Sequence, residues 1–92
     1  MNKKTEKMIL RAIKLKEQMT AQCSLIAAEA KKHLSFVDDG MYCGVDSDGC
    51  LRLFIDIIDK DVYIAIRPYQ FFCNLPPNGK YSKEELRELN EM

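Results

Sequence analysis

Two stretches with a Leu, Ile or Val at every second position, 51–57 and 62–66, constrain the fold of this chain more than any other feature. These aliphatic residues fall on odd positions in the first stretch and on even positions in the second. Because side chains alternate between the two faces of a strand, both stretches share one apolar face only if each odd position lies opposite an even one. A tight turn at residues 59–60 meets this condition and predicts an antiparallel hairpin that pairs Ile57 with Val62.

A third strand is expected at 41–45, where the apolar positions are odd. A three-residue loop then pairs Val45 with Leu51, and Gly49 stands where a type I turn with a bulge needs a left-handed residue. The chain therefore predicts a three-stranded antiparallel meander of order 1-2-3 across residues 41–67. Its core face is expected to pack on the preceding helix and to consist of Val45, Leu51, Leu53, Ile55, Ile57, Val62, Ile64 and Ile66.

Residues 3–34 predict one long amphipathic helix, because apolar side chains recur every three or four residues and neither Gly nor Pro interrupts them. At about 1.5 Å per residue this helix is much longer than a strand of the meander at about 3.3 Å per residue. It must therefore overhang the sheet, so we expect either a break near Thr20 or a free portion that packs on another chain. The repeat, called the apolar stripe below, consists of Met8, Ala12, Leu15, Met19, Cys23, Ile26, Ala30 and Leu34, and Ile9, Ile13 and Ala27 widen it.

The region after the meander gives a weaker signal. Residues 68–73 are apolar enough for a continued strand or for a helical turn that begins at the proline. A loop is expected at 74–81, and the capping box formed by Ser82 and Glu85 predicts a short helix at 82–92. Its apolar content is thin, so we expect it to dock weakly or on a partner. All 92 residues then form a single α+β domain.

The net charge of zero conceals an asymmetry between the two parts of the chain. Residues 1–34 carry eight Lys or Arg against three Glu, for +5, and residues 35–92 carry six against eleven acidic residues, for −5. Such a split indicates one basic surface, either a solvated face or a contact for phosphates or an acidic protein. We define the basic ridge as Lys3, Lys7, Lys14 and Lys32, on the side of the helix opposite the stripe, together with Arg11 near their edge.

The second face of the meander combines three aromatic residues, Tyr42, Phe54 and Tyr63, with Arg52 and Arg67. Aromatic rings beside arginines on a sheet are what single-stranded nucleic acids use for stacking and phosphate pairing. The alternative is that a C-terminal segment or a second subunit covers this face.

Catalytic and metal-binding signatures are missing from the sequence. The four cysteines, Cys23, Cys43, Cys50 and Cys73, match no zinc framework, so reduced structural thiols are expected. In the meander register Cys43 points to the core and Cys50 points away. His33 is expected to contact the terminal carbonyls of the helix rather than to act as a base. The sequence thus favours a non-enzymatic protein without a cofactor or metal.

No apolar run is long enough to cross a bilayer, and the charged start is unlike a signal peptide. We therefore expect no membrane partner and a cytoplasmic location, in a host cell if the gene is viral.

These observations favour a protein that acts by contact, as an inhibitor or adaptor that occupies a surface of a larger protein or nucleoprotein complex. In size and charge layout it is similar to the small proteins that phages and mobile elements make against host defence, anti-CRISPR proteins among them. Two alternatives stay open. One is RNA or single-stranded DNA binding through the aromatic face, with possible nucleic-acid contact by the basic helix. The other is a self-associating structural protein, for example a homo-dimer held by the overhanging helix.

Overall fold

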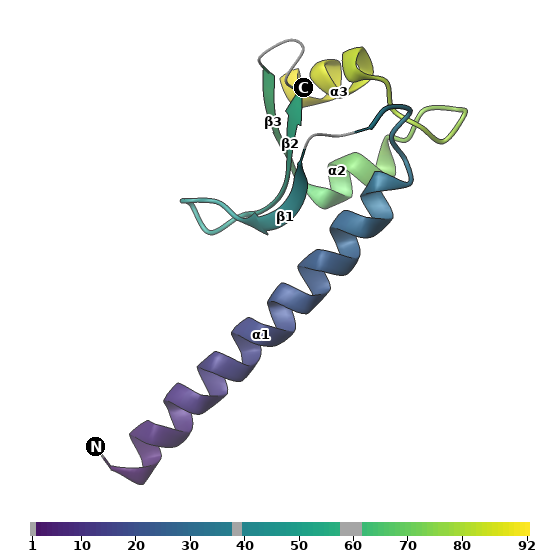
Figure 1. Cartoon of the computed structure of the whole chain (residues 1–92). Helices are drawn as coiled ribbons and strands as arrows, with labels where there is room; N and C mark the ends of the chain where they lie inside the picture. Colours follow the sequence, from purple (N-terminus) through teal and green to yellow (C-terminus); the bar gives the residue numbers. More distant parts are fainter. Residues whose placement is uncertain (1, 38–39, 58–61) are drawn as a thin grey trace.

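The computed structural model of the chain describes residues 2–37, 40–57 and 62–92 and has the predicted α+β architecture (Figure 1). The elements are α1 (Lys3–Lys31), β1 (Met41–Val45), β2 (Leu51–Ile57), β3 (Val62–Ile66), α2 (Pro68–Cys73) and α3 (Lys83–Glu91).

The sheet has the predicted antiparallel order β1-β2-β3. The pairings of Val45 with Leu51 and of Ile57 with Val62 confirm both predicted registers. Gly49 adopts a φ of 81°, the left-handed conformation that the turn between β1 and β2 requires. The turn expected at residues 59–60 lies outside the described residues.

Helix α1 is continuous, so the expected break near Thr20 is absent from the described structure. Its first turn is capped by Asn2, whose side-chain oxygen accepts a hydrogen bond from the Thr5 amide at 2.8 Å. The helix ends at Lys31, not at Leu34 as predicted, because the next residues pair with Tyr81 instead. The Tyr81 amide donates to the carbonyl of His33 at 2.8 Å, and the amide of Ser35 donates to the carbonyl of Tyr81 at 2.9 Å.

His33 makes a different contact from the expected one. Its Nδ1 lies 2.8 Å from the carbonyl oxygen of Gly79, in the loop before α3, rather than against a helix-terminal carbonyl. The reason is the pairing with Tyr81, which brings this loop beside the end of α1. His33 therefore joins two parts of the fold.

Residues 68–73 form the helical alternative, with Pro68 in the first turn of α2, where its missing N–H is tolerated. The capping box of Ser82 and Glu85 is confirmed at the start of α3. The expectation that this helix docks weakly or on a partner is wrong, since Leu86 and Leu89 are buried in the core. Two leucines on one helix face suffice because they meet a sheet face that α1 leaves open.

The core lies between one face of the sheet and the last turns of α1, together with α2 and α3 (Figure 1). Phe71 is fully buried at its centre, and the hydroxyl group of Tyr81 donates to the Phe71 carbonyl at 2.6 Å. The helix that was expected to cover the sheet alone therefore shares this task with two short helices and a tyrosine. Four of the eight predicted core-face residues are buried: Leu53, Ile55, Ile64 and Ile66.

The other core-face predictions fare differently. Val45 and Leu51 are exposed, at 45% and 37%, because they flank the turn at the end of the hairpin, away from the core residues. The side chains of Ile57 and Val62 lie outside the described part of the structure.

The N-terminal part of α1 extends from the body as a straight rod (Figure 1). The radius of gyration of 16.4 Å and the extents of 54 × 24 × 23 Å reflect this rod. A compact domain of this length has a radius of gyration of about 12 Å. The prediction that the helix overhangs the sheet is confirmed. Within the described residues, α1 and the shorter helices all lack the length or the apolarity to cross a membrane.

Candidate functional site

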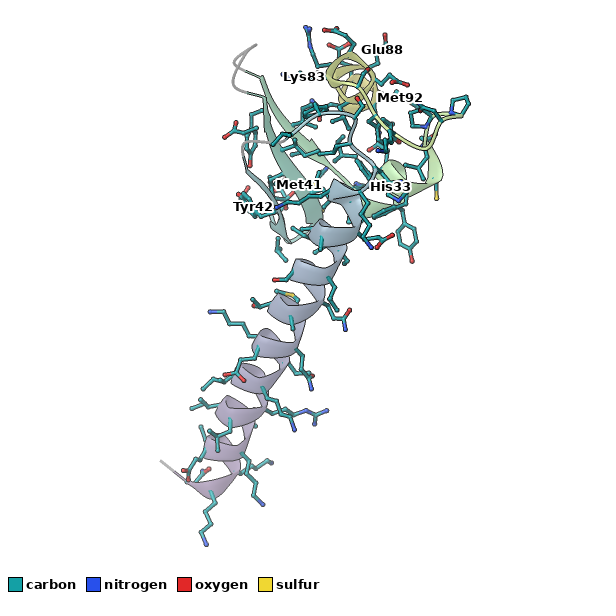
Figure 2. All side chains as sticks on the ribbon, turned by 45° about the vertical axis from the view of Figure 1, so that its right-hand side comes forward. His33, Met41, Tyr42, Lys83, Glu88 and Met92 are labelled. Atoms are coloured by element: carbon teal, nitrogen blue, oxygen red, sulfur yellow. The ribbon has the colours of Figure 1, made fainter. Side chains whose placement is uncertain are left out.

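The overhang, defined as residues 3–22 of α1, projects from the body of the protein (Figure 1). Every one of these residues is exposed, and the first buried residue along α1 is Cys23. Figure 2 shows the side chains of this part radiating from the rod, away from the body. At about 1.5 Å per residue the overhang is about 30 Å long.

The apolar stripe runs the whole length of α1, but only its C-terminal half is covered. Cys23 and Ala30 are 7% and 0% exposed in the docked half. Met8, Leu15 and Met19 are 63%, 54% and 45% exposed in the overhang. The same helix face therefore changes from exposed to buried between Met19 and Cys23, although the apolar repeat continues unchanged.

The basic ridge divides in the same way. Lys3, Lys7, Arg11 and Lys14 all lie on the overhang and are exposed. Lys32 lies just beyond the end of α1, where its Nζ is 3.1 Å from a carboxylate oxygen of Glu29. Residues 3–22 contain six basic and two acidic residues, which gives the overhang a net charge of +4. Most of the ridge thus lies on the overhang.

A groove of about 410 Å³ lies where the overhang meets the body, between α1 and β1. Met19 belongs to both the stripe and the groove, so the exposed apolar surface continues into this groove. Cys23 and Cys43 also line it. Burial, followed by the neighbouring thiol of Cys23, raises the pKa of Cys43 to about 11, so its thiol is protonated at neutral pH.

The aromatic residues of the second sheet face form one stack. The ring centroids of Tyr42 and Phe54 are 4.9 Å apart, and those of Phe54 and Tyr63 are 5.9 Å apart, with nearly parallel planes. Desolvation, followed by the interaction with Tyr42, raises the pKa of Tyr63 to about 12. Phe54 is only 8% exposed between them, whereas Tyr42 and Tyr63 are 56% and 55% exposed.

This stack bears on nucleic-acid binding. Both ring faces of Phe54 are occupied by the tyrosines, so bases find free ring faces only on the outer sides of the stack. The expected alternative, in which the C-terminal segment covers the aromatic residues, is wrong because Leu86 and Leu89 of α3 pack on the core side.

The two arginines of this face lie in one shallow hollow, at the end of the sheet away from Asp56. Arg52 donates from Nε to Asp46 Oδ2 at 3.0 Å. The other oxygen of Asp46 accepts the amides of Asp48 and Cys50, each at 2.9 Å. The Cys50 amide and the other donors hold the pKa of Asp46 below its usual range.

The contact of Asp46 with the candidate site residue Arg52 was not predicted from the sequence. The role of Asp46 follows from its place in the turn, because an aspartate at the start of a tight turn accepts amides two and four residues later. Its carboxylate is thereby aimed at Arg52. The described residues contain no group of three or more His, Cys, Asp or Glu side chains that could hold a metal.

Comparisons of the chain with protein families, with curated proteins and with solved structures find no match.

Proposed function

We propose that the protein is a non-catalytic binding protein whose overhang docks on an acidic surface of a larger protein or nucleoprotein complex, as an inhibitor or adaptor. The observation that carries this proposal is the exposed half of the apolar stripe. A helix in a protein gains most of its stability by packing its apolar face, and a contiguous exposed apolar patch is typical of an interaction site. The overhang has such a face but no packing partner among the described residues.

Charge identifies the kind of partner. The overhang carries +4, so a second copy laid along it would oppose another +4 at close range. An acidic partner gains from the same charge, because basic side chains at the rim of an apolar contact speed association and favour complementary surfaces. An acidic groove that accepts an amphipathic helix fits both the stripe and the ridge.

The groove between α1 and β1 extends this contact surface. Met19 leads from the stripe into the groove, where Tyr42 forms part of the opposite wall. A partner segment that packs along the stripe therefore also contacts the body of the protein, where the overhang begins. This second contact fixes the position of the partner along the helix.

The test uses the tagged full-length protein as bait in a lysate of the organism that encodes it. The double variant Lys7→Glu/Lys14→Glu reverses two charges of the ridge, and Lys80→Glu/Arg87→Glu reverses two charges on the body as a matched control. The two ridge exchanges replace lysine on α1 with glutamate, a residue of similar helix propensity. We expect one acidic partner that is retained by the wild type and the control and lost by the ridge variant.

Two results contradict the proposal. Equal capture by the ridge variant and the control would mean that the ridge takes no part. Sedimentation of the purified protein as a dimer at micromolar concentration, disrupted by Leu15→Asp, would assign the stripe to a second copy instead. Salt dependence gives a further check, since raising the salt concentration weakens charge-driven association.

A further inference from the structure

The hollow at the end of the second sheet face is separate from the overhang and shares no residue with it. It has a volume of about 600 Å³ and is lined by Arg52, Arg67, Tyr69, Gln70 and Met92. These residues come from β2, from the link between β3 and α2, from α2 itself and from the end of α3. An inference about this hollow therefore stands independently of the proposed function.

Arg52 is held in place before any ligand arrives. Asp46 accepts only its Nε at 3.0 Å, and two backbone amides fix Asp46 in turn. A guanidinium group has five N–H donors, so the terminal nitrogens of Arg52 remain available for a second acceptor. Its side chain is 26% exposed, which restricts its freedom without closing it off.

Arg67 completes the pair. Leu53 lies opposite Ile66 in the sheet, and continuing this register by one residue places Arg52 opposite Arg67. Two like charges in this position repel each other. Asp46 compensates one of them, and none of the described side chains that line the hollow is acidic. One arginine therefore has no acidic side-chain partner in the lining.

We propose that Arg52 and Arg67 form a binding site for a single phosphate group. Two guanidinium groups offer more N–H donors than the oxygens of one carboxylate can accept. A terminal phosphate has three oxygens and can accept hydrogen bonds from both arginines. The exposed ring of Tyr69, also in the lining, lies where an organic group attached to the phosphate would be placed.

The rest of the face limits the site to one phosphate. Beyond the arginines, the outward positions are taken by the aromatic stack and then by Asp56, which lies opposite Tyr63. A nucleic-acid backbone that crossed this face would leave the basic residues and approach a carboxylate. The site thus fits a phosphate monoester or the terminal phosphate of a longer molecule better than a continuous polyanion.

The experiment titrates the isotope-labelled full-length protein with inorganic phosphate, phenyl phosphate and a short oligonucleotide without a terminal phosphate, at constant ionic strength set with chloride. Amide and arginine side-chain NMR shifts report binding. Saturable binding of phosphate and phenyl phosphate is expected, with shifts concentrated at the hollow. Arg67→Gln should weaken this binding about tenfold or more, because it removes one of two charge-assisted contacts.

Arg87→Gln is the matched control, since Arg87 lies on α3, paired with Glu84 and outside the hollow. It should leave phosphate binding unchanged. An absence of saturable binding up to millimolar phosphate, or equal weakening by the two variants, would overturn the proposal. Binding of the oligonucleotide without binding of either phosphate would also overturn it and would assign the face to nucleic acid.

Discussion

The two halves of α1 carry the same apolar stripe and have opposite fates. From Cys23 onward the stripe is core, packed against β1 and the body, whereas from Met8 to Met19 it is open surface (Figure 1). The period of the apolar residues thus defines a helix face that needs a packing partner. Whether that partner belongs to the same chain depends on how far the rest of the chain extends along the helix. In this protein the body is too short to cover the whole face.

The largest expected effect contrasts two alanines of the stripe. Ala30 is completely buried and Ala12 lies on the same face in the exposed overhang. Ala30→Asp places an unpaired charge in the core and should lower the free energy of unfolding by about 3 kcal/mol or more. Ala12→Asp should lower it by less than about 1 kcal/mol. Urea denaturation of the two variants measures the contrast, and similar losses would show that the overhang packs like the rest of the helix.

A second prediction concerns the tyrosine that ties the loop to the core. Tyr81→Phe leaves the Phe71 carbonyl without its 2.6 Å hydrogen bond and should cost about 1–3 kcal/mol at neutral pH. Tyr69→Phe, at a residue that is 86% exposed, is the control and should be neutral. Thermal unfolding of both variants is the measurement, and an equally stable Tyr81→Phe protein would show that this bond does not contribute.

Tyr81 also predicts a pH dependence. Burial, followed by the nearby Glu85, raises the pKa of Tyr81 in the folded protein. The unfolded chain therefore loses this proton first, from about pH 10 upward, and stability should fall as the pH rises through that region. The fall should be smaller in Tyr81→Phe. Unfolding curves between about pH 9 and about pH 11, roughly one unit on either side of the ordinary tyrosine pKa, test this; identical pH profiles for the two proteins would contradict it.

A smaller contrast uses glycine at two positions of α1. Ala27→Gly in the docked half removes a buried methyl group and adds backbone freedom, so it should cost about 1 kcal/mol of global stability. Ala12→Gly should instead lower helicity only locally. Amide hydrogen exchange distinguishes the two, because the first change affects the slowest amides of the sheet and the second leaves them unaltered. Faster exchange of the sheet amides in Ala12→Gly would contradict this contrast, because it would show that the overhang contributes to global stability.

The smallest effect concerns the turn that positions Arg52. The amides of Cys50 and Asp48 and the guanidinium of Arg52 lower the pKa of Asp46, so its contribution to stability is present above the unfolded value of about 3.9 and is lost as the pH falls through the folded value. Asp46→Asn should therefore show a flatter stability profile below about pH 4 than the wild type. Superimposable acid profiles would contradict this role.

The sheet could be predicted from sequence because its information is local. The alternation across Leu53 and Ile55 and the left-handed Gly49 together determine which residues pair, and the structure confirms both registers. The helix ends at Lys31 instead of Leu34 because a distant residue, Tyr81, competes for the backbone. Such a competition depends on tertiary contact and leaves no mark in the local pattern.

The candidate surfaces were predictable to a different degree. The alternation of side chains along the strands placed Tyr42, Phe54 and Tyr63 on one face of the predicted sheet. Their mutual stacking, however, depends on side-chain conformations. The overhang followed from comparing lengths, whereas the cover of the core by α3 did not. Leu86 and Leu89 are two apolar residues in a charged segment, and their burial becomes evident only once the open part of the sheet is known.

The most direct test of the central claim compares two exposed leucines of α1, one on the apolar stripe of the overhang and one off the stripe in the half that joins the body. Leu15 lies on the apolar stripe and Leu25 lies off it, and both are exposed, at 54% and 62%. The affinity of Leu15→Asp and Leu25→Asp for the acidic partner captured with the wild type should be measured at one salt concentration. Docking through the stripe predicts about tenfold or weaker binding for Leu15→Asp and unchanged binding for Leu25→Asp. Equal affinities, or a loss confined to Leu25→Asp, would contradict it.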